Sequence, residues 1–453
     1  MGWMAGIERR RTGSPRRRAR LGAVLLVAAV VAGCSGGPTS GSTPSPTGPA
    51  PTGTETTGSI ATATAPASPT EAPIDTDAPV DTDTPGPSAS PMPTLAGRSL
   101  VWQSIDLPKK LSAAADSAAQ NAIFGFAHGY LAFRENVVSG SAIPWLSSDG
   151  TQWQEGRTLD MTGLNHGAQV DEVVDGPAGL LALGRTPGCA DDGTGCTPEP
   201  ATALWTSVDG LVWSRVDLGK AFGGAAVGDV SAGPKGYMAV SLSTDDAASA
   251  AAVWLSSDGQ NWHSASLLPA TFQDAYLARG TVLSDGFLLA GRIGSVAGWG
   301  AGSFPWTTPA VWWSADGAAW SRVALAAAKA ASQAEAAVTT IAEGKLVAHV
   351  GSWDCTCPPD GDGQAWTSSD GRTWKAAGSQ FPSPAVVLSD GRQALQVVAS
   401  DAGLTVAVSS DGFKWARVVE SGSGPADLSD EAYGPGGLLV EDSNGDLWLA
   451  VIG

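Results

Sequence analysis

The stretch Trp254–Trp262, WLSSDGQNW, decides the fold because it recurs along the chain. Its pattern is W-x-S-x-D-G-x-x-W. Four further copies read WLSSDGTQW, WTSVDGLVW, WWSADGAAW and WTSSDGRTW, and a sixth reads AVSSDGFKW, with Ala in place of the first Trp. These five begin at Trp145, Trp205, Trp312, Trp366 and Ala407. Six copies of one motif indicate a repeat architecture.

Each copy predicts a β-hairpin turn. Asp-Gly between two apolar, aromatic-rich runs is a strong hairpin signal. Gly takes a positive φ without steric cost, Asp can accept hydrogen bonds from amides of its own turn, and the preceding Ser can add a weaker bond. The two Trp residues lie on the strands that enter and leave the turn, where each can bury about 150–250 Å².

These segments resemble the Asp-box (BNR) repeats of sialidases and related β-propellers, whose pattern is roughly S/T-x-D-x-G-x-T-W/F. Here Asp and Gly are adjacent, and the Thr of the family appears only as Thr373. In that family the Asp box is structural and lies away from the ligand-binding face. The resemblance therefore implies structural roles, with calcium binding as the alternative, for Asp149, Asp209, Asp258, Asp316, Asp370 and Asp411.

Two further strand-like runs precede each Asp box. In one unit, residues 229–231 lead to 236–241, and 252–255 and 262–265 follow. The second run recurs as GYLAFR, GLLALG, GFLLAG, GKLVAH and GGLLVE. Four short strands in a unit of about 50 residues are typical of a propeller blade.

The two ends of the repeat region complete one unit. Residues 447–453 align with the third strand of a blade, and no fourth strand follows. Near the start, WQSIDL (Trp102–Leu107) matches the outer strand WSRVDL (Trp213–Leu218). We therefore predict an all-β, seven-bladed β-propeller of four-stranded blades, closed by an N-terminal outer strand that removes an exposed sheet edge. Six or eight blades are the alternatives.

Residues 1–33 are predicted to be a lipoprotein signal peptide. Seven arginines between Arg9 and Arg20 precede an apolar run, Leu21–Ala32, that is too short to favour a membrane-spanning helix. The run ends in VAGC, which resembles the lipobox of bacterial lipoproteins and implies cleavage before Cys34 and lipidation of its thiol. An ordinary signal peptide with an incidental Cys is the alternative. We expect a protein anchored by lipid to the extracytoplasmic face of the cell membrane.

Residues 34–96 combine the lipidated Cys with a disordered linker rich in Ser, Thr and Pro. Such a composition cannot bury enough apolar surface to fold. A flexible chain of roughly 60 residues spans ~45 Å, which would hold the domain away from the membrane. Residues 97–453 form the predicted propeller.

The chain is strongly acidic, with 44 Asp and Glu against 26 Lys and Arg. Removal of the signal peptide leaves 43 acidic and 19 basic residues, a formal charge of −24. The repeat region has no basic stripe interleaved with aromatic residues, which argues against nucleic acid as a partner. We expect a monomer without a cofactor.

Four further cysteines form two close pairs, Cys189 with Cys196 and Cys355 with Cys357. In an exported protein these predict disulfides, and their places in different blades favour pairing within each pair. A metal site is the alternative. The four histidines do not stand at ligand spacing from a cysteine pair; they are His128, His166, His263 and His349.

Three long insertions between second and third strands are the predicted location of function: 186–202, 294–309 and 352–364. They carry Trp299, Phe304, Trp306 and Trp353, which either contact a sugar or peptide ligand or pack as lids over the inner strands. Asp354, Asp360 and Asp362 resemble a loose cation loop without the spacing of a known calcium motif. Ligand-binding candidates near the ends of second strands are Arg134, Arg185 and Arg292.

We expect a non-catalytic binding or scaffolding module for an envelope protein or glycan, and predict no catalytic residue. The alternatives are a sialidase-like glycoside hydrolase and an assembly factor for envelope complexes. The hydrolase would need a Tyr–Glu nucleophile pair, and no pairing is evident for Tyr130, Tyr237, Tyr276 and Tyr433. The Phe/Tyr-Arg-Ile-Pro motif of sialidases is absent, and a fold alone is no warrant for chemistry.

Overall fold

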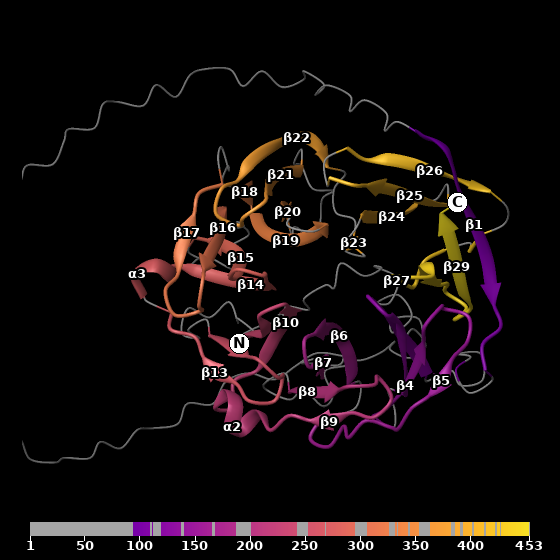
Figure 1. Ribbon diagram of the computed structural model, residues 1–453, viewed down its shortest axis with the longest axis horizontal. Helices are drawn as coiled ribbons and strands as arrows, with labels where there is room; N and C mark the ends of the chain where they lie inside the picture. Colours follow the sequence, from indigo (N-terminus) through magenta and orange to yellow (C-terminus); the bar gives the residue numbers. More distant parts are fainter. Residues whose placement is uncertain are drawn as a thin grey trace, which may run out of the picture. The chain divides into compact units, whose positions relative to one another are not determined.

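The computed structural model describes the chain between residues 94 and 452 with gaps, the longer ones at 112–118, 187–200, 242–251, 295–305 and 353–362. Most of the described residues are in β-strands, and the helices are few and short (Figure 1). The predicted signal peptide, Cys34 and nearly all of the linker lie outside them. No helix in the described part of the chain has the length and apolar character of a membrane span.

Consecutive strands form antiparallel four-stranded sheets. The first contains β2 (Ala119–Phe126), β3 (Gly129–Asn136), β4 (Ser141–Ser147) and β5 (Gln154–Glu155). The second contains β6 (Gln169–Gly176), β7 (Gly179–Arg185), β8 (Thr202–Ser207) and β9 (Ser214–Arg215). The third contains β10 (Val227–Gly233), β11 (Gly236–Ser241), β12 (Val253–Ser256) and β13 (His263–Ser264).

The same order continues toward the C-terminus. The next sheet contains β14 (Ala275–Val282), β15 (Phe287–Ile293), β16 (Trp306–Ser314) and β17 (Ser321–Val323), with β18 (Ala331–Ser332) also paired to β16. It is followed by β19 (Ala334–Ala342), β20 (Lys345–Ser352), β21 (Gly363–Ser368) and β22 (Lys375–Phe381).

An eight-stranded sheet joins the two ends of the described chain. It contains β23 (Val386–Ser389), β24 (Ala394–Ser400), β25 (Gly403–Ser409), β26 (Ala416–Ser421), β1 (Thr94–Ile105), β29 (Leu447–Ile452), β28 (Gly437–Glu441) and β27 (Asp430–Gly434). The predicted pairing of the N-terminal strand with the last strand is present, with Trp102 opposite Ala450 in an antiparallel ladder. The sequence did not predict that β1 also pairs with β26, in parallel, with Leu100 opposite Glu420.

The first strands of neighbouring sheets lie next to one another. Along the chain, β2 contacts β6, β6 contacts β10, β10 contacts β14, β14 contacts β19, β19 contacts β23, and β23 contacts β27. Because β27 also contacts β2, the succession closes on itself. Four-stranded antiparallel sheets in a closed succession make a β-propeller-like all-β fold.

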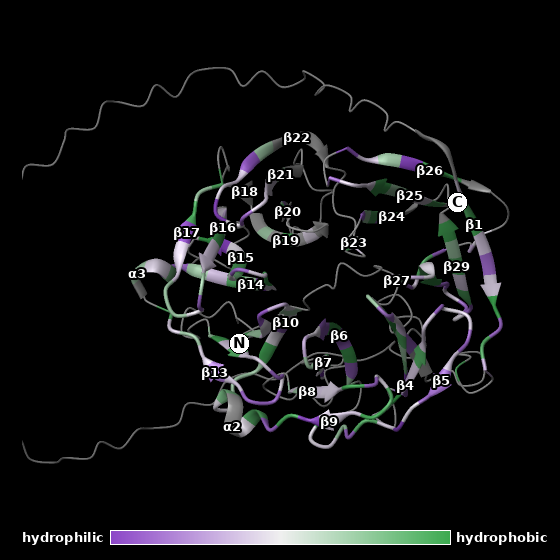
Figure 2. Cartoon of the chain, in the orientation of Figure 1, coloured by the Kyte–Doolittle hydropathy of each residue, from purple (hydrophilic) through white to green (hydrophobic). Residues whose placement is uncertain are grey.

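The core lies between the sheets. Strands such as β11 are buried along their whole length because a neighbouring sheet covers each face. Clusters of buried apolar side chains therefore join residues from two sheets, as in the group that contains Met238 of β11 and Leu289 of β15. Figure 2 shows hydrophobic residues along strands such as β25 and β29. The sheets approach so closely at Gly125 that a Cβ there would lie 1.9 Å from the Tyr433 carbonyl oxygen.

Two short helices cover tryptophans of the repeats. Helix α2 (Leu218–Phe222) places Phe222 4.7 Å from the Trp254 ring, edge to face. Helix α3 (Pro269–Phe272) stacks Phe272 on Trp312 at 5.5 Å. The sequence pattern did not predict these helices, which follow the outer strands of two sheets.

Candidate functional site

The Asp-box turns have the geometry predicted for them. In the first copy the amide of Gly150 donates to Ser147 Oγ at 2.8 Å, and the amides of Thr151 and Gln152 donate to Asp149 Oδ1 at 2.7 and 3.0 Å. Gly150 has φ 81°, in the left-handed region that favours Gly. The same bonds recur in the other complete copies, and the amide of Lys414 donates to Asp411 in the sixth.

These bonds favour the ionised carboxylates. Amide donors from Gln152 and Thr151 lower the pKa of Asp149 to about 2, and those from Thr373 and Arg372 lower the pKa of Asp370 to about 2. A carboxylate oxygen shared by two amides of its own loop is engaged in holding the turn. The geometry therefore agrees with structural roles for the Asp-box carboxylates.

The two tryptophans of each copy have different environments. The first is buried wherever it occurs, and Ala407 is buried in its place in the sixth copy. The second packs at the turn and donates its indole N–H to the Gly carbonyl, as Trp262 does to Gly259 at 2.9 Å. The same bond occurs at Trp153, Trp213, Trp320 and Trp374.

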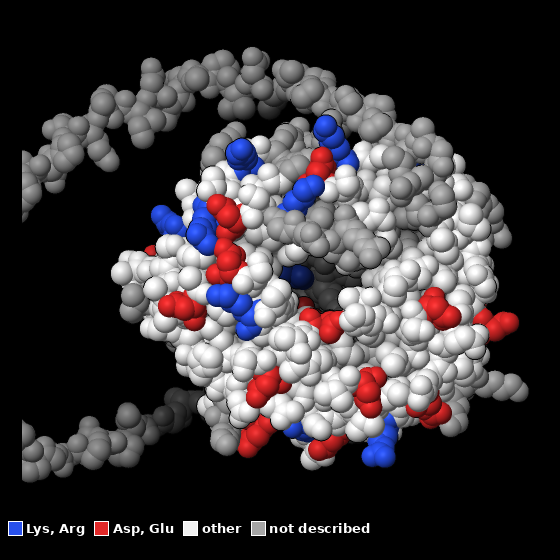
Figure 3. Space-filling view, in the orientation of Figure 1, with Lys and Arg blue, Asp and Glu red and all other residues white. Residues whose placement is uncertain are grey.

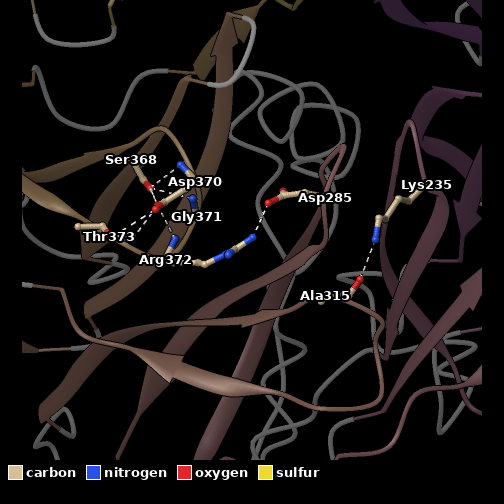
Figure 4. A network of polar contacts seen from close by, with 8 residues as sticks. All are labelled: Lys235, Asp285, Ala315, Ser368, Asp370, Gly371, Arg372 and Thr373. Carbon is tan, nitrogen blue, oxygen red and sulfur yellow. Dashed lines mark hydrogen bonds and ion pairs between the residues drawn. The ribbon is translucent and has the colours of Figure 1, made fainter.

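Turns of neighbouring sheets are linked on the edge that carries the Asp boxes (Figure 4). Lys235, in the turn between β10 and β11, donates to the carbonyl of Ala315 at 2.7 Å, inside the next Asp box. Arg372 forms an ion pair with Asp285 at 2.5 Å and lies 4.0 Å over the Trp313 ring. This edge is therefore occupied by contacts between turns.

Two of the tyrosines also join sheets. The Tyr237 hydroxyl donates to the Gly179 carbonyl at 2.6 Å and accepts the Ala178 amide at 3.1 Å. At the equivalent place in β3, the Tyr130 hydroxyl donates to the Gly437 carbonyl at 2.7 Å. Burial raises the pKa of both phenols, which opposes the ionised form that a nucleophile would need.

The three candidate arginines lie toward the ends of second strands, as predicted, in β3, β7 and β15, each with its own surroundings. Arg134 donates to the Leu111 carbonyl at 3.4 Å. The guanidinium of Arg292 stacks on Tyr276 at 4.1 Å. These two guanidinium groups thus contact different partners, the Leu111 carbonyl and the Tyr276 ring.

Among the three arginines, Arg185 lies near several carboxylates. Its Nε donates to Asp171 Oδ2 at 2.7 Å, and Gln169 donates to the other oxygen at 3.1 Å. Burial lowers the pKa of Arg185, but the charges of Asp171, Glu172 and Asp229 outweigh burial and raise it. This group is a charged cluster at the start of the first long insertion.

The remaining candidates fall largely outside the described residues. Trp306 begins β16, where its backbone pairs with Ser332 of β18. Outside the described residues lie Trp299, Phe304, Trp353, Asp354, Asp360, Asp362 and the cysteines Cys189, Cys196, Cys355 and Cys357. Within the described part of the chain, no cluster of three or more His, Cys, Asp or Glu has a geometry that could hold a metal ion.

Sequence reasoning missed the carboxylates that join neighbouring sheets. Asp430 accepts the Ile123 amide at 2.9 Å, and Glu172 accepts the Val230 amide at 3.2 Å, in each case from the next sheet. Glu135 of β3 accepts the Val170 amide at 2.5 Å. Acidic residues in otherwise apolar strands were the available signal, since a buried charge requires a partner.

Comparisons with known proteins give no family for the chain. No protein-family model and no curated protein matches it. Similar solved structures include a protein of unknown function from Dyadobacter fermentans DSM 18053, at 15% identity and a TM-score of 0.40, over 79% of this chain and 99% of that protein.

Two enzymes are also among the similar structures. A GH74 xyloglucanase from Xanthomonas campestris shares 16% identity at a TM-score of 0.39 over 70% of this chain, and a prolyl endopeptidase shares 15% at 0.41 over 74%. The chain spans 46% of the length of each of these two proteins. Similarity at this level carries neither activity to this chain.

Proposed function

We propose that this protein is an extracytoplasmic lipoprotein whose seven-bladed β-propeller is a non-catalytic binding or scaffolding module for an envelope protein or glycan. Seven blades follow if the eight-stranded sheet counts as two, β23–β26 and β27–β29 with β1. The lipid anchor would be at Cys34, and the linker would carry the propeller away from the membrane.

One observation carries the non-catalytic proposal. Side chains that could act in catalysis are hydrogen-bonded to the backbone of neighbouring sheets. The hydroxyls of Tyr130 and Tyr237 bond to carbonyls of neighbouring sheets, and the carboxylates of Glu172 and Asp430 accept backbone amides. Side chains bonded in this way connect neighbouring sheets. Ligand contact would then fall to the insertions that follow second strands, on the edge opposite the Asp boxes.

A cross-linking pull-down from native envelope extract tests the proposal. The bait is the full chain in detergent, and the comparison bait carries Trp299→Ala, Trp306→Ala and Trp353→Ala. Capture of a protein or polysaccharide by the first bait, and its loss with the second, is expected. A bait carrying Val208→Ala is the control, because Val208 is 87% exposed on an Asp-box turn and should leave capture unchanged.

The outcomes separate the alternatives. Equal capture by the tryptophan variant and the original chain would contradict binding through the insertions. A different result would be that the purified chain hydrolyses model glycosides and loses this activity when one Tyr or Glu is changed. That result would favour a sialidase-like hydrolase over a binding module.

A further inference from the structure

The boundaries between first strands of neighbouring sheets, which we call seams, share one kind of contact in several places. At three seams a carboxylate on one first strand accepts an amide N–H from the next. Asp430 accepts from Ile123 at 2.9 Å, Glu172 from Val230 at 3.2 Å, and Asp229 from Gly280 at 2.8 Å. The donors are edge amides, which would otherwise have no partner within their own sheet.

The three carboxylates occupy one equivalent position, which the strand register defines. Val230 pairs with Ala239, and Ala239 pairs with Trp254, the first Trp of the Asp box. Asp229 directly precedes Val230. Glu172 and Asp430 hold the same place in β6 and β27, because the residues that follow them pair through Ala182 to Trp205 and through Val440 to Trp448.

In β14 this position is occupied by Arg279. It directly precedes Gly280, which pairs through Leu289 with Trp312. The charge of Arg279 acts on His349 of β20, in the next sheet, where burial and this charge lower the pKa of the imidazole to about 4. Arg279 therefore holds, at the seam between β14 and β19, the strand position that the carboxylates hold at theirs.

The strand register places a second hydrogen-bond donor at this seam. The amide equivalent to that of Val230 is Val338, which pairs through Ala348 with Trp366. A guanidinium has five N–H donors and no acceptor, so Arg279 cannot receive this amide. Arg279 is half-buried, and the described residues show no carboxylate in an ion pair with it. Figure 3 shows a hollow near the centre of one face, with both basic and acidic residues around it.

We propose that the seam between β14 and β19 binds an oxyanion, a carboxylate or phosphate group of a ligand, between the Arg279 guanidinium and the Val338 amide. The group would take the place of the carboxylate that the chain supplies at three other seams. Guanidinium matches such groups with two parallel hydrogen bonds. The inference rests on the proposed binding function. It predicts that the ligand carries an anionic group. Because the chain carries a formal charge of −18, the attraction must be local to this seam.

The test measures thermal unfolding of the full chain in detergent. Sodium phosphate and sodium acetate are titrated separately, with ionic strength held constant by sodium chloride. A ligand that binds the folded state raises Tm in a saturable manner. The original chain should show this rise with at least one anion, and comparison of the two distinguishes phosphate from carboxylate recognition.

Two substitutions at one position make the test specific. Arg279→Glu supplies a carboxylate like those of Asp430, Glu172 and Asp229, and should abolish the anion effect while raising the basal Tm. Arg279→Gln should abolish the effect without that gain. Arg372→Gln, on the Asp-box edge, is the control and should retain the effect.

Several results would overturn the proposal. These are no rise in the original chain beyond that of chloride, or an equal rise in both Arg279 variants. If the variants do not fold, the original chain labelled with ¹⁵N-valine decides the matter. The Val338 amide signal must shift with phosphate or acetate, and an unmoved signal contradicts the site. Capture of an envelope partner through the insertion tryptophans, with no anion effect, would retain the binding function and remove this inference.

Discussion

The hydroxyl of Tyr237 donates a 2.6 Å hydrogen bond to the carbonyl of Gly179, which begins β7 of the neighbouring sheet. The bond connects residues 58 positions apart at the turn ends of two second strands. Tyr130 repeats the arrangement with Gly437. These contacts fasten the edge of one sheet to the next.

Tyr237→Phe should lower the free energy of unfolding by about 1–3 kcal/mol, because it leaves a part-buried carbonyl and amide without their partner. Urea unfolding of the full chain measures the loss. Tyr130→Phe should behave alike. Val208→Ala, at an exposed position, should change the free energy by no more than about 0.5 kcal/mol. An unchanged midpoint for both tyrosine variants would contradict a role in joining sheets.

The Asp-box carboxylates should make stability depend on acid pH. The folded-state pKa of Asp370 is about 2, below the unfolded value near ~3.9. Its contribution is therefore present above the unfolded pKa and is lost as pH falls through about 2. Asp370→Asn should lower Tm at pH 6, and its difference from the original chain should shrink toward pH 2. A difference that is constant with pH would exclude this linkage.

The ion pair between Arg372 and Asp285 should contribute little to stability. Both side chains are about half exposed, at 50% and 49%, so water screens their attraction. A double-mutant cycle with Arg372→Ala and Asp285→Ala should give a coupling of about 0.2–1 kcal/mol that weakens with salt. Arg372→Ala alone should cost more than Asp285→Ala, because it also removes the stacking on Trp313. If the two single variants lose the same free energy of unfolding, the stacking on Trp313 contributes nothing to stability.

Cys34→Ala should release the protein from the membrane. The predicted thioether-linked lipid requires the Cys thiol, and multiple acyl chains give stable anchoring. Metabolic labelling with palmitate should mark the original chain and not the variant, and the variant should leave the membrane fraction. Ser35→Ala is the control. Labelling of the Cys34 variant would show that the VAGC motif is not the lipidation site.

Much of the local structure could be predicted from residues near one another in the chain. The turn at Ser256, Asp258 and Gly259 is specified by bonds that span two or three residues, so the motif alone predicts it. The strands on either side were also predictable, as β11 and β12 lie within 236–241 and 252–255 apart from one residue. The match between WQSIDL and WSRVDL predicted that β1 would pair with β29.

The contacts between sheets were decided by the tertiary structure. The bond from the Ile123 amide to Asp430 spans 307 residues, and no local pattern specifies which buried carboxylate meets which edge amide. Two features became apparent only from strand register. These are the parallel pairing of β1 with β26, and the place of Arg279 at a seam position where three other first strands have a carboxylate. The sequence by itself determined the turns and the order of strands, because their hydrogen bonds are local. Closure of the fold determined the seams, because an edge amide finds its acceptor only when two sheets lie side by side.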